Sequence, residues 1–150
     1  MKNLLHPEVK TEVLARIDKL TPQTTAKWGK MNVNQNLFHM TKGLDIPSGK
    51  LIPTLAKKSP LPKWLMKFIL LNMAPPKQAV ETFLEMNIVE NKINPTNFEE
   101  ERQRLKNAIT DFGKEEKFIP TNVMAGKFSR DDWGKLNYNH TDHHLRQFGV

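Results

Sequence analysis

The spacing of apolar residues along the chain predicts helices, with few segments suited to strands. Residues 6–20 carry five apolar side chains at helical intervals, and a second apolar stripe runs over residues 33–45. Residues 98–112 combine an acidic first turn with a basic later part, which suits the helix dipole. A further helix is predicted over residues 129–148. The pattern therefore predicts four longer helices.

Residues able to cap a helix stand at three of the expected boundaries. Asn32 and Gln35 have the spacing of a capping box before the second helix, and Ser129 and Asp132 have it before the last. Asn97 can cap the helix that follows it. These residues predict where the three helices begin.

The middle of the chain is rich in proline. Four prolines fall between residues 46 and 62, which predicts an irregular connection. A short amphipathic helix is expected over residues 63–73, while residues 77–96 fit either a short helix or an extended segment. The most economical architecture is an all-α four-helix bundle, a single domain over residues 1–150, with a long connection that carries one or two short helices.

Composition excludes several function classes. The chain has 150 residues, 38% of them hydrophobic, which is enough for one core, and it has no cysteine. Disulfide scaffolds, cysteine zinc sites, iron–sulfur clusters and cysteine nucleophiles are therefore excluded. The longest apolar run is four residues, at 68–71, so neither a membrane span nor a secretory signal is expected. The default expectation is a cytoplasmic protein.

Positive charge gathers in the middle of the chain. The formal net charge is +7, and residues 46–80 contain six lysines and no acidic residue. One interpretation of the basic segment 57–77 is contact with an anionic membrane surface or another acidic partner. The interpretation that the sequence favours is a lid helix with its lysines in solvent. That helix would bury Leu65, Phe68, Ile69 and Met73. No helix-turn-helix or aromatic-basic strand is visible, which argues against nucleic acid as a partner.

Three of the five histidines stand close together near the end of the chain. Residues four apart on a helix differ by about 40° in direction and lie roughly 6 Å apart along the axis, so His140 and His144 can point into the same space. His140 and His143, about 60° apart, form a second candidate pair. Two imidazoles at such spacing are a common half-site for Zn²⁺ or a related transition metal.

A half-site of two histidines needs a third ligand, and His39 is the candidate. It lies about 120° from the centre of the apolar stripe of its helix, in a column with Asn32, Asn36 and Gly43. Small and polar residues in that column predict a space that admits water or a substrate beside a metal. The alternative is a solvated face at the end of the last helix, with His39 as a hydrogen-bonded structural residue.

Three segments carry a resemblance to a known family. The last eleven residues, HTDHHLRQFGV, resemble the terminal HxDHHxRQFG signature of a small bacterial family in the DinB/YfiT-like superfamily of metalloenzymes. Residues 28–40 (WGKMNVNQNLFHM) and 128–140 (FSRDDWGKLNYNH) resemble its second-helix signature and the approach to its last helix. Residues 46–96 find no counterpart. The resemblance implies an up-down-down-up four-helix bundle with a three-histidine metal site.

Carried onto this sequence, the resemblance implies that His39, His140 and His144 are the metal ligands, with an exchange of His144 for His143 left open. A site of three neutral imidazoles keeps at least one open coordination position, which is the catalytic rather than the structural pattern. The resemblance implies a metal-dependent enzyme that acts on a small molecule, and a site of three histidines accepts Zn, Ni or Fe. It would be a hydrolase or a transferase that uses a low-molecular-weight thiol.

Four residues are candidates for contact with the ligands or the substrate: Asn36, His143, Arg146 and Gln147. Gln147 stands where thiol-transferase relatives have a further histidine, and an amide does not readily shuttle protons. The alternative to an enzyme is a non-enzymatic binding or stress-response module of the same fold that contacts anionic surfaces through residues 57–77. A homodimer is compatible with either function.

Overall fold

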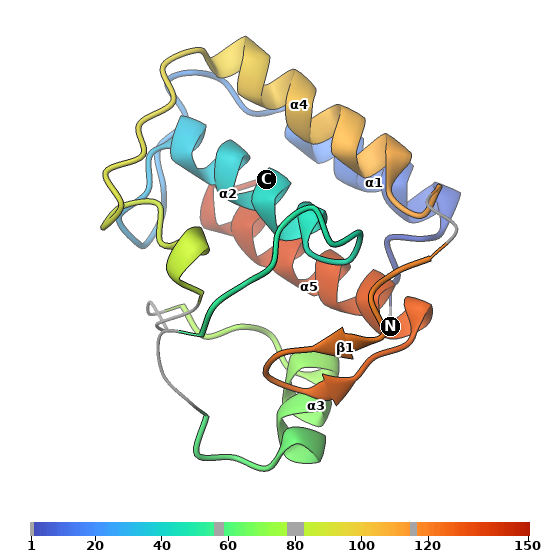
Figure 1. The fold of residues 1–150 in the computed structure, drawn as a ribbon. Coiled ribbons are helices and arrows are strands. Elements are labelled where there is room, and N and C mark those ends of the chain that lie inside the picture. Colours follow the sequence, from blue (N-terminus) through green and yellow to red (C-terminus); the bar gives the residue numbers. More distant parts are fainter. Residues whose placement is uncertain (1, 56–58, 78–82, 115–116) are drawn as a thin grey trace.

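The computed structural model describes residues 2–55, 59–77, 83–114 and 117–150, and it is mostly helical (Figure 1). Within these ranges the chain forms five α-helices, a short 3-10 helix and one two-stranded antiparallel sheet. The α-helices are α1 (Pro7–Ile17), α2 (Val33–Asp45), α3 (Lys63–Asn72), α4 (Phe98–Asp111) and α5 (Arg130–Gln147). The remaining elements are η1 (Leu84–Met86), β1 (Thr121–Asn122) and β2 (Gly126–Lys127).

The predicted capping residues begin three of the helices. The side chain of Asn32 accepts a hydrogen bond from the N–H of Gln35, and the side chain of Gln35 accepts one from the N–H of Asn32. Ser129 and Asp132 form the same reciprocal pair before α5, and the side chain of Asn97 caps α4. Each bond satisfies an N–H that has no partner within its helix. Both capping boxes and the Asn97 cap are confirmed.

Four helices share one apolar core. α2 packs against α4 and α5, and α1 packs against the same two helices, so each of the four has two neighbours (Figure 1). The predicted apolar stripe of α2 is buried in this core. Its residues are Val33, Leu37, Met40 and Leu44. Because α2 and α5 are held side by side along their length, a polar side chain on either facing surface meets the other helix.

α3 and the sheet form a second apolar cluster beside the first half of α5. The ring of Phe128, which follows β2, packs at 4.9 Å from that of Trp133 on α5. Leu71 of α3 belongs to the same cluster. An ion pair of 2.7 Å between Lys67 and Asp132 ties α3 to the start of α5. This cluster closes one end of the molecule.

The sheet is an element that the apolar pattern does not predict. The side chain of Asn122 accepts hydrogen bonds from the N–H groups of Met124 and Ala125, which folds the chain into a turn. Gly126 then has a φ of +74°, a conformation that glycine adopts without strain. A turn of five residues therefore depends on one asparagine and one glycine.

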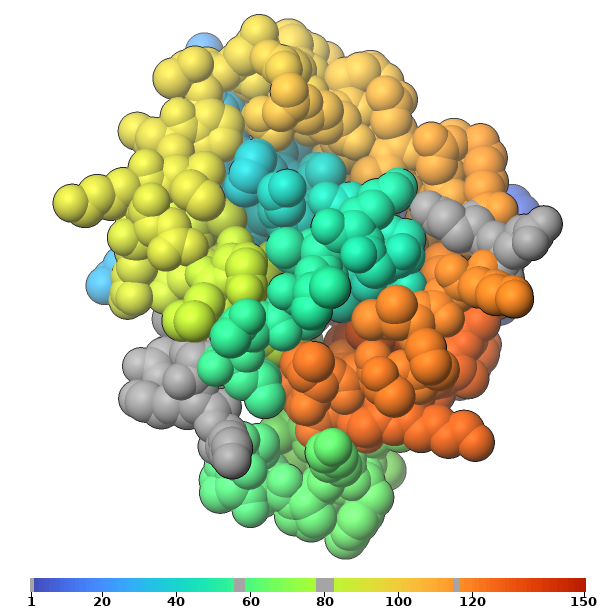
Figure 2. Space-filling model, viewed as in Figure 1, coloured from blue at the N-terminus to red at the C-terminus, as the bar shows by residue number. Residues whose placement is uncertain are grey.

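The predicted helix over 63–73 is present as α3, but the predicted burial of its apolar side chains is wrong. Phe68 is 58% exposed and Met73 is 55% exposed, while Leu65 and Ile69 are only partly buried. The helix instead packs through Met66, Leu70 and Leu71. It lies at the edge of the molecule, where the other side of the helix faces solvent (Figures 1 and 2).

The proline-rich connection holds little regular structure beyond α3. In the ambiguous segment 77–96, the residues from 83 onward form η1 and turns, and residues 78–82 lie outside the described ranges. Lys57 and Lys58 of the basic segment also lie outside them. Among the described residues, no helix combines the length and the apolar content that crossing a bilayer requires.

Candidate metal centre

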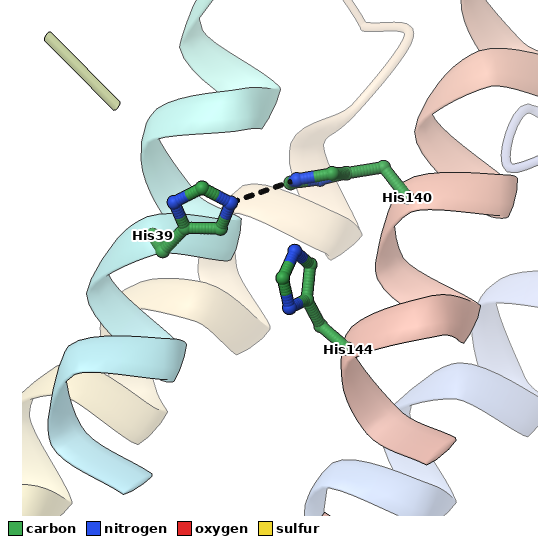
Figure 3. Close-up of side chains that lie close together, drawn as sticks. All are labelled: His39, His140 and His144. Carbon is green, nitrogen blue, oxygen red and sulfur yellow. Dashed lines mark hydrogen bonds between the residues drawn. The ribbon is translucent and has the colours of Figure 1, made fainter. Parts of the chain in front are cut away.

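α2 and α5 bring three histidines together (Figure 3). α2 supplies His39, and α5 supplies His140 and His144 one turn apart. One ring nitrogen of each histidine lies within 4.8 Å of the corresponding atoms of the other two. The ring centroids are between 4.6 and 5.0 Å apart. The three imidazoles are close enough to bind one metal ion.

The separation of the nitrogens fits a divalent ion. With metal–nitrogen bonds of about 2.0–2.1 Å, two ligands of a tetrahedral site have nitrogens roughly 3.3 Å apart. The Nε2 atoms of His39 and His140 are 3.0 Å apart, so a small opening of the rings accommodates the ion. Without a metal the same distance suits an N–H···N hydrogen bond between the two rings. Binding of a metal would displace the proton of that hydrogen bond.

Two of the rings have their protonated nitrogen fixed by an acceptor. Nδ1 of His39 lies 3.1 Å from the carbonyl oxygen of Met86, and Nδ1 of His144 lies 2.9 Å from Oε1 of Gln147. Because both oxygens can only accept, each Nδ1 carries the proton and each Nε2 keeps its lone pair for a metal. Sequence reasoning missed Met86, since a main-chain carbonyl in η1 leaves no signal in the side chains.

Burial keeps the three imidazoles neutral. It lowers the pKa of His39 to about 4. Burial also lowers the pKa of His140 and of His144 well below the usual value, and the neighbouring imidazoles lower both further. Neutral imidazole is the form that binds a metal, so no proton has to leave an imidazolium ion at pH 7.

Gly43 makes room for the ring of His140. A methyl group on Gly43 would lie 2.9 Å from Cε1 and 3.0 Å from Nδ1 of that ring. Carbon atoms in contact normally stay about 3.5–4.0 Å apart, so any side chain at this position displaces the imidazole. Gly43 belongs to the column of small and polar residues predicted beside His39. At this position the small residue leaves the space that the ring of His140 occupies.

His144, rather than His143, joins His39 and His140. The ring of His143 lies outside the group, in edge contact with Trp28 at 5.9 Å and with His144 at 5.0 Å. Burial lowers the pKa of His143, and the nearby Arg146 lowers it further. His143 is therefore a neutral, half-buried neighbour of the cluster.

Arg146 lies outside the cluster as well. Its Nε donates to Asp142 at 2.9 Å, and the other carboxylate oxygen of Asp142 is 2.8 Å from a guanidinium nitrogen of Arg16. These ion pairs connect α5 to α1. Asp142 is thus engaged with arginines rather than with a ligand imidazole.

Gln147 links the cluster to the segment before α2. Its Oε1 accepts from His144, and its Nε2 donates to the carbonyl of Trp28 at 2.7 Å. The second bond fixes the orientation of the amide, so the first bond holds the imidazole at a defined angle. Gln147 is therefore a positioning residue for His144.

The Gln147→Leu variant should bind Zn²⁺ about 10- to 100-fold more weakly, because the Nδ1–H of His144 loses its acceptor. Competition with a chromophoric chelator measures the dissociation constant. Gln103→Leu makes the same chemical change on the exposed side of α4 and should leave the constant unchanged. Equal affinities for both variants would contradict the positioning role.

Two buried polar side chains that neighbour His39 and His140 in sequence lack a hydrogen-bond partner among the described residues. The amide of Asn36, one turn before His39 on α2, is fully buried and unpaired at both its nitrogen and its oxygen. The hydroxyl of Thr141, next to His140, is also buried and unpaired. An unsatisfied buried polar group costs about 1–3 kcal/mol. A water or a small polar molecule in contact with either group would remove that cost.

Comparison with known proteins gives no match to a family model, to a curated protein or to a solved structure. The likeness to the DinB/YfiT-like superfamily therefore continues to rest on the three sequence segments quoted above. The geometry of the histidine cluster is a property of this chain and does not depend on that likeness.

Proposed function

We propose that this protein is a metal-dependent enzyme that acts on a small molecule at a three-histidine centre. The observation that carries the proposal is the convergence of three neutral imidazoles from α2 and α5 around one point. Three protein ligands leave a coordination position open for a reactant, as catalytic sites do. A divalent ion there lowers the pKa of a bound water or thiol and polarises a carbonyl group.

The donor set favours Zn, Ni or Fe. Imidazole nitrogen suits these metals, whereas Mg²⁺ and Ca²⁺ prefer oxygen ligands. His39, His140 and His144 would hold the ion, each through one ring nitrogen. Gln147 and the carbonyl of Met86 would keep the rings of His144 and His39 oriented toward it.

A DinB/YfiT-like fold is part of the proposal. The mutual packing of α1, α2, α4 and α5 supports a four-helix bundle, with α3 and η1 in the connection between α2 and α4. The order of the ligands supports it too, because one histidine comes from the second helix and two, four residues apart, come from the last. This is the ligand order that the sequence resemblance implies.

The residues around the cluster are suited to binding and orienting a polar substrate. The unpaired amide of Asn36, three residues before His39 on α2, offers both a donor and an acceptor. His143 is neutral at pH 7 because burial lowers its pKa, so it can accept a proton from a reactant. Gln147 already donates one bond and accepts another, so its role is orientation.

A cationic depression next to the cluster supports an anionic substrate or thiol. It has a volume of about 330 Å³ and is lined by Lys27, Trp28, Lys77, Arg146, Gly149 and Val150. The ring of Trp28 forms its wall under Lys77 and also contacts His143. A small thiol that carries carboxylates would find its counter-charges there. The same charges suit an anionic substrate of a hydrolase, so both reactions belong to the proposal and the experiment below separates them.

Cobalt substitution tests the open position and the thiol together. The Co²⁺-loaded protein, titrated with cysteine, should develop a near-ultraviolet thiolate-to-cobalt absorption band that saturates with the thiol. Serine, the matched oxygen analogue, should not produce the band. A cobalt spectrum that cysteine leaves unchanged would remove the thiol reaction from the proposal. Failure to retain cobalt at all would contradict the metal centre.

A further inference from the structure

α3 presents an exposed apolar face at the edge of the molecule. Trp64 is 71% exposed, and Phe68, four residues later, shares its side of the helix. Leu61 before the helix and Met73 at its end are also exposed. Scattered apolar side chains are ordinary on a surface, but an exposed tryptophan and phenylalanine together mark a site of interaction.

The side chains around this face are basic. Residues 46–80 contain six lysines and no acidic residue, Lys63 at the start of α3 is exposed, and so is Lys127 of β2, the strand that packs against α3. Lys67 reaches inward to Asp132 at 2.7 Å and holds α3 in place. The apolar face is therefore bordered by positive charge, which is complementary to an anionic partner.

The same charge distribution argues against a second copy of this chain as the occupant. A two-fold contact through α3 would place the lysines of one copy against those of the other. α3 is a convex element at the edge of the molecule, a shape that fits a bilayer surface as well as a groove on another protein, so the basic side chains around it decide in favour of an anionic surface (Figure 2). A helix with aromatic side chains on its outer face and lysines beside them has the composition of a helix that lies in a membrane interface.

We propose that α3 binds anionic lipid bilayers. Trp64 and Phe68 enter the interfacial region, and Lys63 and Lys127 contact lipid phosphates beside them. α3 stays attached to the protein through Leu70, Leu71 and the ion pair of Lys67, so binding requires no refolding. This surface is independent of the histidine cluster, and its function goes beyond the proposed reaction.

Vesicle binding tests the proposal on the intact protein. At low salt, vesicles of phosphatidylcholine with phosphatidylglycerol should sediment the protein and shift its tryptophan emission to shorter wavelength. Phosphatidylcholine alone should do neither, and salt should release the protein by screening the lysines. The Trp64→Ala variant should lose the emission shift although Trp28 and Trp133 remain, and it should bind at least about tenfold more weakly.

Two variants with the same change of charge distinguish binding through α3 from general attraction by the net charge of the protein. Lys63→Glu should lower the vesicle partition coefficient about thirtyfold, because two charges change at the lipid surface. Lys19→Glu makes the identical substitution at an exposed position after α1 and should change it by less than about threefold. Likewise Leu84→Ala removes an exposed leucine outside α3 and should bind as the original chain does.

Three results would overturn the proposal. Absence of binding to anionic vesicles at low salt would do so directly. Equal weakening by Lys63→Glu and Lys19→Glu would show attraction by net charge alone. Self-association that Trp64→Ala abolishes, without vesicle binding, would assign the face to a second copy of the chain. Circular dichroism checks that each variant is folded, and loss of any metal bound by the histidines is not expected in any of them.

Discussion

Alanine in place of His39, His140 or His144 is expected to lower metal affinity about a hundredfold to a thousandfold. The estimate follows from the roughly 10–16 kcal/mol that four ligands contribute at structural zinc sites, shared among the ligands. Each of the three rings places one nitrogen near the same point. When one ring is removed, the other two histidines cannot supply the missing ligand. Elemental analysis after dialysis gives the stoichiometry, and chelator competition gives the dissociation constant.

His143→Ala is the matched control for these variants. It removes an imidazole from the same turn of α5 as His144, yet its ring contacts Trp28 from outside the cluster. It should keep one metal ion per chain with an affinity within about threefold of the original. Metal that persists in His39→Ala, or that is lost in His143→Ala, would show that the ion is held elsewhere.

The metal-free protein is expected to lose stability as the pH falls from 7 to 4. The folded chain holds His39 with a pKa of about 4, whereas the unfolded chain has the usual value near 6.5. Between these values the unfolded state binds the extra proton, so the free energy of unfolding decreases as the pH falls through this window. His39 alone accounts for about 3 kcal/mol, since one unit of pKa corresponds to about 1.4 kcal/mol.

Urea unfolding of the chelator-treated protein at several pH values measures this effect. The His39→Phe variant keeps an aromatic ring but cannot titrate, so its unfolding free energy should depend less steeply on pH over the same range. His6→Phe changes an exposed histidine before α1 and should follow the original profile. A profile for His39→Phe that coincides with that of the original chain would refute the assignment.

The helices and their starts were predictable because the signals that set them are local. The apolar stripe of α2 and the reciprocal bonds of Asn32 with Gln35 involve residues within one or two turns. The approach of His140 to His144 also follows from helical periodicity alone, since four residues make about one turn. His39 required one more step, namely that its column on α2 faces another helix.

Other features depend on contacts between distant parts of the chain, and the pattern along the sequence does not contain them. Whether Phe68 or Leu71 of α3 is buried depends on where the segment around Phe128 packs, about sixty residues later. The acceptor for His39 is a carbonyl from η1, in a segment that fits helix or strand equally well. Gln147 was a candidate by position, but its bridge to Trp28 joins opposite ends of the chain.

Glycine at position 43 lowers the stability of α2 but leaves room for the ring of His140. A glycine inside a helix is about 0.5–1 kcal/mol less favourable than alanine, so a redesign guided by thermostability would select alanine at this position early. That single methyl group would intrude on the imidazole opposite it. A directed-evolution campaign that screened for melting temperature alone would thus select against the present position of the His140 ring.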